Sequence, residues 1–483
     1  MATKPNIVFI LTDDQGAWAM NCAGTSELHT PNLDRIAAAG MRFDNFFCAS
    51  PVCSPARASL LTGRIPSAHG VHDWLRCGNL DAERFEKQGK ENPYGGYVDE
   101  RKPIAYLKGQ MTYTDLLSRN GYCCALSGKW HLGDSIHNQC GFSKWYTIGK
   151  GGAFYYHADM VDNGDITVEH GKYVTDLITE RALSYLDDLK DSPFYLAVHY
   201  TAPHSPWGAD QHPKKWIDYY KDCEFFGIPD VPDHPDMTTG PVYGTRNRRE
   251  NLTGYFAAIS AMDEQVGRIL DRLEELALLE NTLVIFTADN GMSMGHHGIW
   301  GKGNGTFPMN MYDTAVKVPF LASWKGHIPE GKVCTELVSA YDVFQTILEL
   351  TDIHWDGEAE LPGKSFAGLL LDQPGDRGEN AVVVFDEYGP VRMIRTKEWK
   401  YVHRYPYGKN ELFNLKEDPG EEHNLFGETQ YEEKVLEMKR KMEGWFTTYV
   451  NPEIDGTKEG VTGLGQLDRA GQWASQIEVY KKG

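Results

Sequence analysis

Continuous apolar runs alternate with helix-like segments along most of this chain. The run "PNIVFIL" at residues 5–11 is almost wholly apolar, as expected of a strand buried on both faces of a sheet. "YCCALS", "PFYLAVHY" and "NTLVIFTA" have the same character, and helical periodicity precedes each of them, over residues 111–121, 175–190 and 262–279. The alternation predicts an α/β fold with a large, mostly parallel sheet sandwiched by helices.

A different pattern begins near residue 375. "DGEAELPG" and "DQPGDRGEN" are rich in Gly, Pro and acidic residues, which is typical of a domain boundary. Beyond them, "VRMIRTKEWKYVHRY" and "ELFNL" predict short antiparallel strands, and residues 431–446 predict an amphipathic helix. We therefore expect a larger α/β domain over residues 1–375 and a smaller C-terminal α+β domain over residues 376–483.

Polar side chains follow four of the predicted strands. In chain order they are Asp13 and Asp14, then Lys129 and His131, then His204, then Asp289 and Asn290. Any one of them alone is more often a cap or a turn former. The carboxyl ends of parallel strands, however, meet at one edge of a sheet, where ligands of open α/β sheets bind. Together they predict a functional site.

Four of these residues, Asp13, Asp14, Asp289 and Asn290, offer only oxygen ligands. Oxygen ligands suit Ca²⁺ or Mg²⁺ rather than zinc. Three carboxylates in one crevice repel one another unless a divalent cation lies between them. The alternative is that they are separate turn and cap residues.

The stretch "PVCSPARASLLTGR" at residues 51–64 places a cysteine at the start of a predicted helix. Ser54 is expected to be the N-cap and Pro55 the first helical residue. Cys53 then lies at the positive end of the helix dipole with Arg57 one turn away, and both effects favour an anion, either a thiolate or a bound oxyanion. The alternative is a buried, inert cysteine beside a capped helix.

Composition limits the partners and the compartment. The chain has 48 Lys and Arg against 68 Asp and Glu, a net charge of −20, so we expect neither nucleic acid nor a membrane as a partner. The N-terminal apolar run is too short for a membrane span and is interpreted as a strand rather than a signal peptide. We expect a cytoplasmic protein, unless a leader has been removed. Nine cysteines, an odd number, predict no disulfide framework.

"CSPARASLLTGR" resembles the signature of the type I, formylglycine-dependent sulfatases of the alkaline phosphatase-like superfamily, which runs Cys-x-Pro-Ala/Ser-Arg and continues to Leu-Thr-Gly-Arg. The resemblance extends, in the family's order, to "PNIVFILTDDQG", "GKWHLG", "TAPHSP", "TADNG" and "WGKG". One departure is visible in "MYDTAVKVP", where Asp313 and Lys317 stand in place of the expected Glu and Arg. This departure bears on local packing or on the pocket rim.

The resemblance implies that Cys53 is a precursor, oxidised after translation to Cα-formylglycine by a formylglycine-generating or anaerobic sulfatase-maturating enzyme. One hydroxyl of the aldehyde hydrate would attack sulfur, and the other would later expel sulfate. The resemblance also implies a metal, Ca²⁺ in preference to Mg²⁺. Its ligands would be Asp13, Asp14, Asp289, Asn290 and the modified residue 53.

The remaining candidates have roles that the resemblance implies and their chemistry supports. Arg57 would steady the ionised hydrate. Lys129 and Lys302 would bind the sulfate oxygens and offset charge in the transition state. His204 would protonate the leaving alcohol, and His131 would be the base that releases sulfate.

Three functions remain open. The leading one is a sulfuric ester hydrolase that acts on a sulfated small molecule or glycan, with a sulfated carbohydrate expected. The second is a hydrolase of phosphate mono- or diesters or phosphonates on the same scaffold, which the strict Cys-x-Pro-x-Arg signature disfavours. The third is a catalytically silent protein that binds sulfated glycans, in which Cys53 stays a thiol. The intact set of metal, acid and base candidates argues against it.

Overall fold

The computed structural model of the protein describes residues 4–86, 99–238, 247–357, 360–373, 375, 381–387, 389–406, 408–475 and 478–483. Its centre is a ten-stranded sheet in the order β13-β2-β12-β9-β1-β8-β4-β5-β6-β7. The five parallel strands in the middle are β9 (Thr282–Ala288), β1 (Asn6–Thr12), β8 (Phe194–His199), β4 (Cys123–Gly128) and β5 (Phe142–Ile148). The predicted fold class, a mostly parallel sheet with helices, is confirmed.

The outer strands give the sheet its mixed character. On one side, β12 (Phe320–Ser323) is antiparallel to β9 and is followed by β2 (Met41–Phe43) and β13 (Lys332–Cys334). On the other side, the hairpin of β6 (His157–Asp162) and β7 (Asp165–His170) adds two antiparallel strands.

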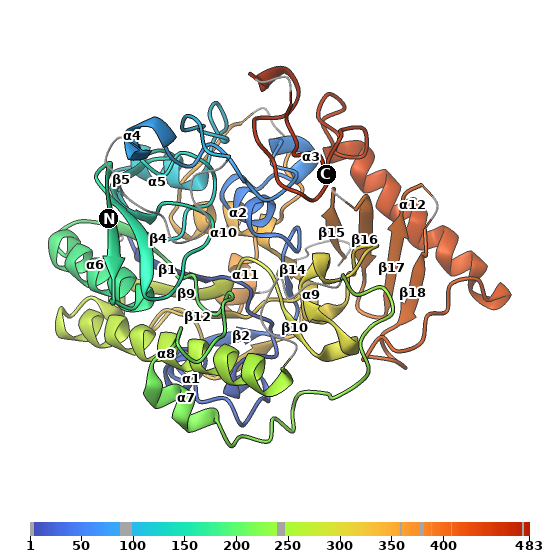
Figure 1. Cartoon of the computed structure of the whole chain (residues 1–483), viewed down its shortest axis with the longest axis horizontal. Helices are drawn as coiled ribbons and strands as arrows, with labels where there is room; N and C mark the ends of the chain where they lie inside the picture. The colour runs from blue at the N-terminus through green and yellow to red at the C-terminus, as the bar shows by residue number, and fades with distance from the viewer. Residues whose placement is uncertain are drawn as a thin grey trace.

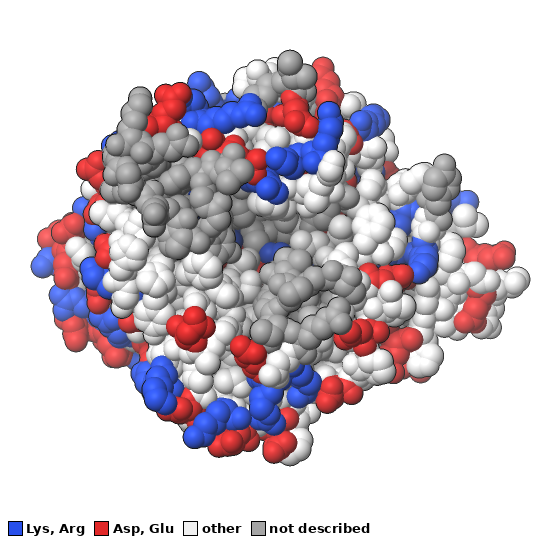
Figure 2. Space-filling view, in the orientation of Figure 1, with Lys and Arg blue, Asp and Glu red and all other residues white. Residues whose placement is uncertain are grey.

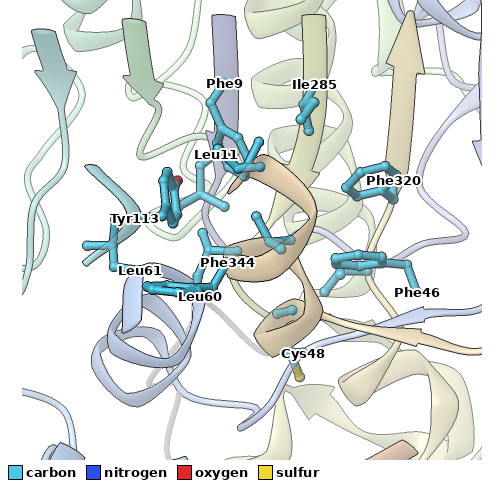
Figure 3. Close-up of a cluster of buried hydrophobic side chains, with 14 of the residues drawn as sticks. Phe9, Leu11, Phe46, Cys48, Leu60, Leu61, Tyr113, Ile285, Phe320 and Phe344 are labelled. Carbon is cyan, nitrogen blue, oxygen red and sulfur yellow. The ribbon is translucent and has the colours of Figure 1, made fainter. Parts of the chain in front are cut away.

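Both faces of the sheet are buried under helices (Figure 1). Along β1, Ile7, Phe9 and Leu11 belong to one apolar cluster and Val8 and Ile10 to the other, because successive side chains of a strand point to opposite faces. The first cluster packs against α2 (Cys53–Thr62), α5 (Tyr113–Arg119) and α10 (Val343–Leu350), and the second against α1 (Pro31–Ala38), α6 (Val174–Leu189) and α8 (Arg248–Glu275). Figure 3 shows the first of these interfaces, where Phe9, Leu11 and Ile285 face Phe344 and α2.

One helix begins earlier than its periodicity predicts. The pattern predicts a helix over residues 262–279, whereas α8 spans Arg248–Glu275. The first half of α8 is buried almost all round, so it has no polar face that would reveal the helical period. Its start is marked by Asn247, whose side chain accepts a hydrogen bond from the Glu250 backbone N–H.

The C-terminal region forms a four-stranded antiparallel sheet covered by a helix. The strands are β15 (Val382–Asp386), β16 (Val391–Arg395), β17 (Trp399–Arg404) and β18 (Glu411–Asn414). On them lies α12 (Glu432–Tyr449), which buries Met438, Met442 and Phe446. The predicted strands and helix are confirmed. The domain boundary near residue 375 stays a prediction, and most of "DQPGDRGEN" lies outside the described residues.

After α12, residues 450–475 and 478–483 return toward α2 and α3 (Pro66–His69) (Figure 1). There Gln466 forms an isolated bridge with Leu75 and another with Tyr480. Among the helices that the structure describes, none is long and apolar enough to cross a membrane.

Candidate active site

The central strands deliver their polar side chains to one edge of the sheet. Asp13 and Asp14 follow β1, and Asp289 follows β9, its neighbour in the sheet. Lys129 and His131 follow β4, and the segment after β8 leads to His204. The N-terminus of α2 adds Cys53 and Arg57, and the loop after β11 (Trp300–Gly301) adds Lys302. Figure 2 shows the surface of this face hollowed near its middle, with charged atoms at depth.

Each of the three carboxylates is held by a different cation. Asp13 Oδ2 accepts a hydrogen bond from Lys129 Nζ at 2.5 Å. Asp14 Oδ1 accepts one from Lys302 Nζ at 2.6 Å. Asp289 Oδ2 accepts one from Arg57 Nε at 2.9 Å. All six side chains are buried, so these interactions are little screened by water.

The closeness of the charged groups shifts the pKa values of the carboxyl groups. Burial by itself would raise the pKa of Asp13, but Lys129, with His204 and Arg57 behind it, holds this pKa well below its usual value. Burial and the charge of Asp13 raise the pKa of Asp289 to about 6. Neighbouring carboxylates resist simultaneous ionisation unless further positive charge is present.

The residues present fit a hard divalent cation. Ligand atoms from Asp13, Asp14, Cys53 and Asp289 all lie within 4.8 Å of one another. Asn290 donates its Nδ2 to Asp14 Oδ1 at 2.7 Å, which fixes its amide. Two buried oxygens, Asp14 Oδ2 and Asn290 Oδ1, have no hydrogen-bond partner in the described part of the chain. Unsatisfied carboxylate and amide oxygens are the ligands that Ca²⁺ takes in proteins.

Cys53 begins α2, and its surroundings favour the protonated thiol. Its Sγ lies 3.2 Å from Asp13 Oδ1 and 2.9 Å from Lys302 Nζ. Burial and the charge of Asp13 raise the pKa of the Cys53 thiol far above its usual value. Of the two anions that the helix dipole and Arg57 were expected to favour, the thiolate is opposed here by desolvation and by a carboxylate, and the bound oxyanion stays a prediction.

The predicted cap of this helix is also wrong. Val52 occupies the N-cap position, and Ser54 lies inside the first turn of α2. The Ser54 hydroxyl accepts a hydrogen bond from the Leu75 backbone N–H at 3.1 Å. A contact with a segment about twenty residues away thus replaces the local capping that Ser-Pro favours.

Arg57 binds Asp289 and has a further N–H group that could bind a second anion. Its Nη1 donates to the Lys129 carbonyl at 3.1 Å. Its Nη2 is buried and has no acceptor among the residues described. Burial lowers the pKa of Arg57, but Asp289 and Asp13 more than compensate, so the net shift is upward and the group stays a cation.

His131 presents a bare ring nitrogen in the site. Its Nε2 lies 3.3 Å from the Leu75 carbonyl oxygen, and because a carbonyl only accepts, Nε2 carries the proton. Nδ1 is then an acceptor, buried and without a partner in the described ranges. Burial and the charges of Lys129 and Arg57 hold the pKa of His131 well below its usual value, so the ring is neutral. Gly151 packs on the ring, since a Cβ there would lie 2.1 Å from Nε2.

His204 is anchored through its other ring nitrogen and has a more open position. Its Nδ1 lies 2.7 Å from the Ser205 carbonyl oxygen, so Nδ1 donates. Its Nε2 points toward Asp14 Oδ2 at 3.6 Å, and the side chain is 19% exposed. His204 therefore stands where the buried cluster meets solvent.

Two further residues hold this site through the backbone. The Tyr255 hydroxyl donates to the Asp14 carbonyl at 2.9 Å. Asn310 Nδ2 donates to the carbonyl of Lys302 at 2.9 Å. Asp14 and His131 both have positive φ, 61° and 55°, a strained region for residues with a side chain. Neither Tyr255 nor Asn310 carries a signal in a single sequence, because each acts through another residue's backbone.

Comparison with known proteins identifies relatives along nearly the whole chain. A family model described as "Sulfatase" matches residues 5–353, and one described as "N-sulphoglucosamine sulphohydrolase, C-terminal" matches residues 295–447. An ulvan-active sulfatase of Formosa agariphila is 30% identical, covering 91% of this chain and 80% of that relative. An N-acetylglucosamine-6-O-sulfatase of Bacteroides thetaiotaomicron is 26% identical, covering 94% and 88%. A solved structure in complex with its substrate D-glucosamine-2-N,6-O-disulfate superposes with a TM-score of 0.77 at 25% identity, covering 95% of this chain and 100% of that one.

Proposed function

The chain belongs to the sulfatase family, and from this premise we propose that it releases inorganic sulfate from a sulfated carbohydrate through a modified Cys53. One observation carries the proposal. The cysteine of the Cys-x-Pro-x-Arg signature lies with its Sγ 3.2 Å from Asp13 Oδ1 and 2.9 Å from Lys302 Nζ, inside the acidic cluster. The sugar is supported by the relative that is an N-acetylglucosamine-6-O-sulfatase and by the similar structure that holds a disulfated glucosamine.

We propose that Cys53 is converted to Cα-formylglycine, whose hydrate supplies a hydroxyl nucleophile. The raised pKa of the thiol disfavours the thiolate that direct sulfur chemistry needs. Lys302 already contacts the Sγ position, so its ammonium would hold an oxygen at the same place. Arg57, with its spare Nη2, would stabilise negative charge there.

Asp13, Asp14, Asp289 and Asn290 would hold Ca²⁺, which when bound polarises a sulfate oxygen and lowers the pKa of the residue 53 hydroxyl. The formal charges of the site support a divalent ion. Three carboxylates balance Arg57, Lys129 and Lys302. A dication leaves a net charge of +2, which matches a sulfate ester monoanion together with one ionised hydroxyl.

The remaining roles follow from the atoms that each side chain has available. Lys129 and Lys302, oriented by Asp13 and Asp14, would donate to the sulfate oxygens, where charge develops. His204, anchored through Nδ1, would deliver a proton from Nε2 to the leaving alcohol at the mouth of the site. His131, neutral with a bare Nδ1, would act as the base that releases sulfate.

The test begins with the chemical state of residue 53. The protein is produced with a formylglycine-generating enzyme, and the mass of the tryptic peptide Phe43–Arg57 is measured beside a control sulfatase from the same cells. We expect an aldehyde or its hydrate at position 53. An unmodified thiol, with the control converted, would point instead to a silent protein that binds sulfated glycans.

Matched substrates then decide the reaction. Aryl sulfate and aryl phosphate carry the same leaving group, so their relative kcat/KM values report the choice between sulfur and phosphorus. We expect sulfate release to dominate. Faster phosphate release would assign the site to phosphate ester hydrolysis.

A further inference from the structure

The C-terminal tail, residues 450–475 and 478–483, contacts residues 70–76, and one of the side chains that it contributes there, Gln466, is buried. This tail lies beyond residue 447, where the second family match ends. Gln466 is 0% exposed. Its backbone N–H donates to the Trp74 carbonyl at 2.8 Å, and its carbonyl accepts from the Arg76 N–H at 3.0 Å.

The Gln466 side chain adds further hydrogen bonds to residues 70–76. Its Oε1 accepts from the His72 backbone N–H at 2.9 Å. Its Nε2 donates to the Gly70 carbonyl at 2.9 Å and to the Asp468 carbonyl at 2.8 Å. The amide therefore ties Gly70 and His72 to the tail through a fully buried side chain.

Residues 70–76, which Gln466 binds, contact the proposed active site through Leu75. The Leu75 N–H donates to Ser54 Oγ, next to Cys53. Its carbonyl is the acceptor 3.3 Å from His131 Nε2. Since Gln466 bonds the backbones on both sides of Leu75, the position of this carbonyl depends on the tail.

We propose that Gln466 is a positioning residue for the sulfatase reaction: by fixing the Leu75 carbonyl it keeps the proton of His131 on Nε2 and leaves Nδ1 bare in the site. The role of His131 as a base rests on the proposed function, whereas the effect of Gln466 on the ring tautomer does not. A neutral histidine exchanges its two tautomers readily, and the hydrogen bond made by one nitrogen decides which one is bare. When Leu75 withdraws, the tautomer with a proton on Nδ1 becomes populated, and that form has no lone pair for the reaction.

Other tail contacts hold the same segment but do not flank Leu75 in this way. Asp73 Oδ2 accepts from the Gly465 N–H at 3.1 Å, and the Tyr480 hydroxyl lies 2.6 Å from His72 Nδ1. These contacts are expected to keep the tail docked when the Gln466 amide is removed. The Gln466 variants remove the side-chain bonds to Gly70 and His72 and keep the backbone bonds at Trp74 and Arg76, so they loosen the segment without releasing the tail.

The test uses Gln466→Ala and Gln466→Met, the second of which keeps the volume of the side chain should the first fail to fold. The matched control is Ser475→Ala, on the same tail, whose hydroxyl donates to Asp468 and not to residues 70–76. The tautomer is read from the ring nitrogens of ¹⁵N-histidine-labelled protein. His131→Gln identifies the His131 signals among the 17 histidines. This measurement uses the Cys53 protein and needs no activity.

In the wild type and in Ser475→Ala we expect a single His131 tautomer with the proton on Nε2. In the folded Gln466 variants we expect a mixture of tautomers. In the enzyme with converted Cys53 we expect kcat to fall by up to about 10-fold relative to the wild type, while KM changes by less than about threefold. An unchanged tautomer with unchanged kcat, or a loss confined to KM, would overturn the proposal. A tautomer that shifts in the Gln466 variants, in a protein whose wild type releases no sulfate, would overturn the proposed function and leave the positioning role standing.

Discussion

Two clusters of buried charge in this protein are built from the same residue types and serve different ends. The first is the proposed active site. The second, here called the junction cluster, joins α9 (Asp313–Val316) to the C-terminal sheet and consists of Asp313, Lys317, Arg395, Lys400 and Glu421. Lys400 Nζ reaches Asp313 Oδ1 at 2.5 Å, the Met311 carbonyl at 2.9 Å and Glu421.

The difference lies in what each cluster leaves unsatisfied. Lys400 donates to Asp313 Oδ1 and to the Met311 carbonyl and forms an ion pair with Glu421. Glu421 Oε1 and Arg395 Nε are the buried atoms of this cluster without a hydrogen-bond partner among the described residues, and Arg395 lies over the Phe47 ring. The proposed active site instead leaves several buried polar atoms without a hydrogen-bond partner in the part of the chain that is described. They are Asp14 Oδ2, Asn290 Oδ1, Arg57 Nη2 and His131 Nδ1. Buried charge alone therefore does not identify a site, whereas convergent unsatisfied atoms do.

The comparison also shows where the departure from the family's pattern, at Asp313 and Lys317, lies in the structure. Asp313 and Lys317 both belong to the junction cluster, with Lys317 Nζ 3.7 Å from Asp313 Oδ2. Their contacts are with Lys400 and Arg395 of the C-terminal sheet. The departure thus concerns packing between the two sheets.

The largest expected effect is that of Cys53→Ala, which deletes the proposed nucleophile. We expect sulfate release to fall by about 10⁴-fold or more, as when other enzymes lose a nucleophile, with the unfolding temperature little changed. Cys48→Ala is the matched control, because Cys48 is also buried near α2 and is given no role in the reaction. Near-wild-type sulfate release from Cys53→Ala would end the proposed mechanism.

Removal of the metal should affect the proposed active site and leave the junction cluster unchanged. In excess EDTA we expect activity to disappear and to return with Ca²⁺. Ca²⁺ should also raise the unfolding temperature, because it binds only the folded site. The same two measurements on Lys400→Met should show the same response to Ca²⁺, since the junction cluster has no part in holding the metal. Full activity in EDTA would remove the metal from the proposal.

Paired lysine substitutions sharpen the contrast. Lys302→Met should lower kcat by about 10²- to 10³-fold, the usual cost of a lost donor to developing charge. Lys400→Met should leave kcat per folded molecule unchanged and cost about 3–5 kcal/mol of unfolding free energy, because the buried Glu421 and the half-buried Asp313 lose their cation. Urea unfolding and initial rates measure both quantities. A reversed pattern would mean that the clusters have been assigned the wrong way round.

His204→Ala tests the open edge of the site. A sugar or alkyl leaving group needs a proton and an aryl leaving group does not, so we expect about 10²-fold loss or more on a sugar sulfate and much less on an aryl sulfate. His297→Ala is a useful control, since its ring stacks on Tyr312 at 3.8 Å and has no proposed part in proton transfer. Equal losses on both substrates would assign His204 to binding.

Features of the fold and the candidate site could be predicted where the residues that form them lie close together in the sequence. Asp13, Lys129 and Asp289 could be placed together because each directly follows a recognisable strand, and parallel strands end at one edge. The Cys53 signature is contiguous, so the family resemblance could be read from it. Both kinds of inference use residues that lie side by side in the chain.

What escaped prediction involves partners far apart in sequence. Ser54 pairs with Leu75, Asp14 with Tyr255, and Lys400 with Asp313. The buried start of α8 lacks a polar face, and the thiol of Cys53 depends on desolvation that only the folded protein creates. Tertiary contacts overrode local preference in each case.

The smallest expected effect concerns Glu421 and pH. Burial, opposed by Lys400 and reinforced by Asp313, raises the pKa of Glu421 to about 7, above its usual value of 4.5. The folded state then keeps a proton that the unfolded state releases between about pH 4.5 and 7. The contribution of this group to stability is therefore fully present below pH 4.5 and is lost as pH rises through 7, by about 1–3 kcal/mol. Glu421→Gln cannot ionise, so subtracting its pH profile of unfolding free energy from that of the wild type isolates the effect from other groups. A difference that stays flat between pH 5 and 7 would show that Lys400 keeps Glu421 ionised, and the junction cluster would then be a fully charged network.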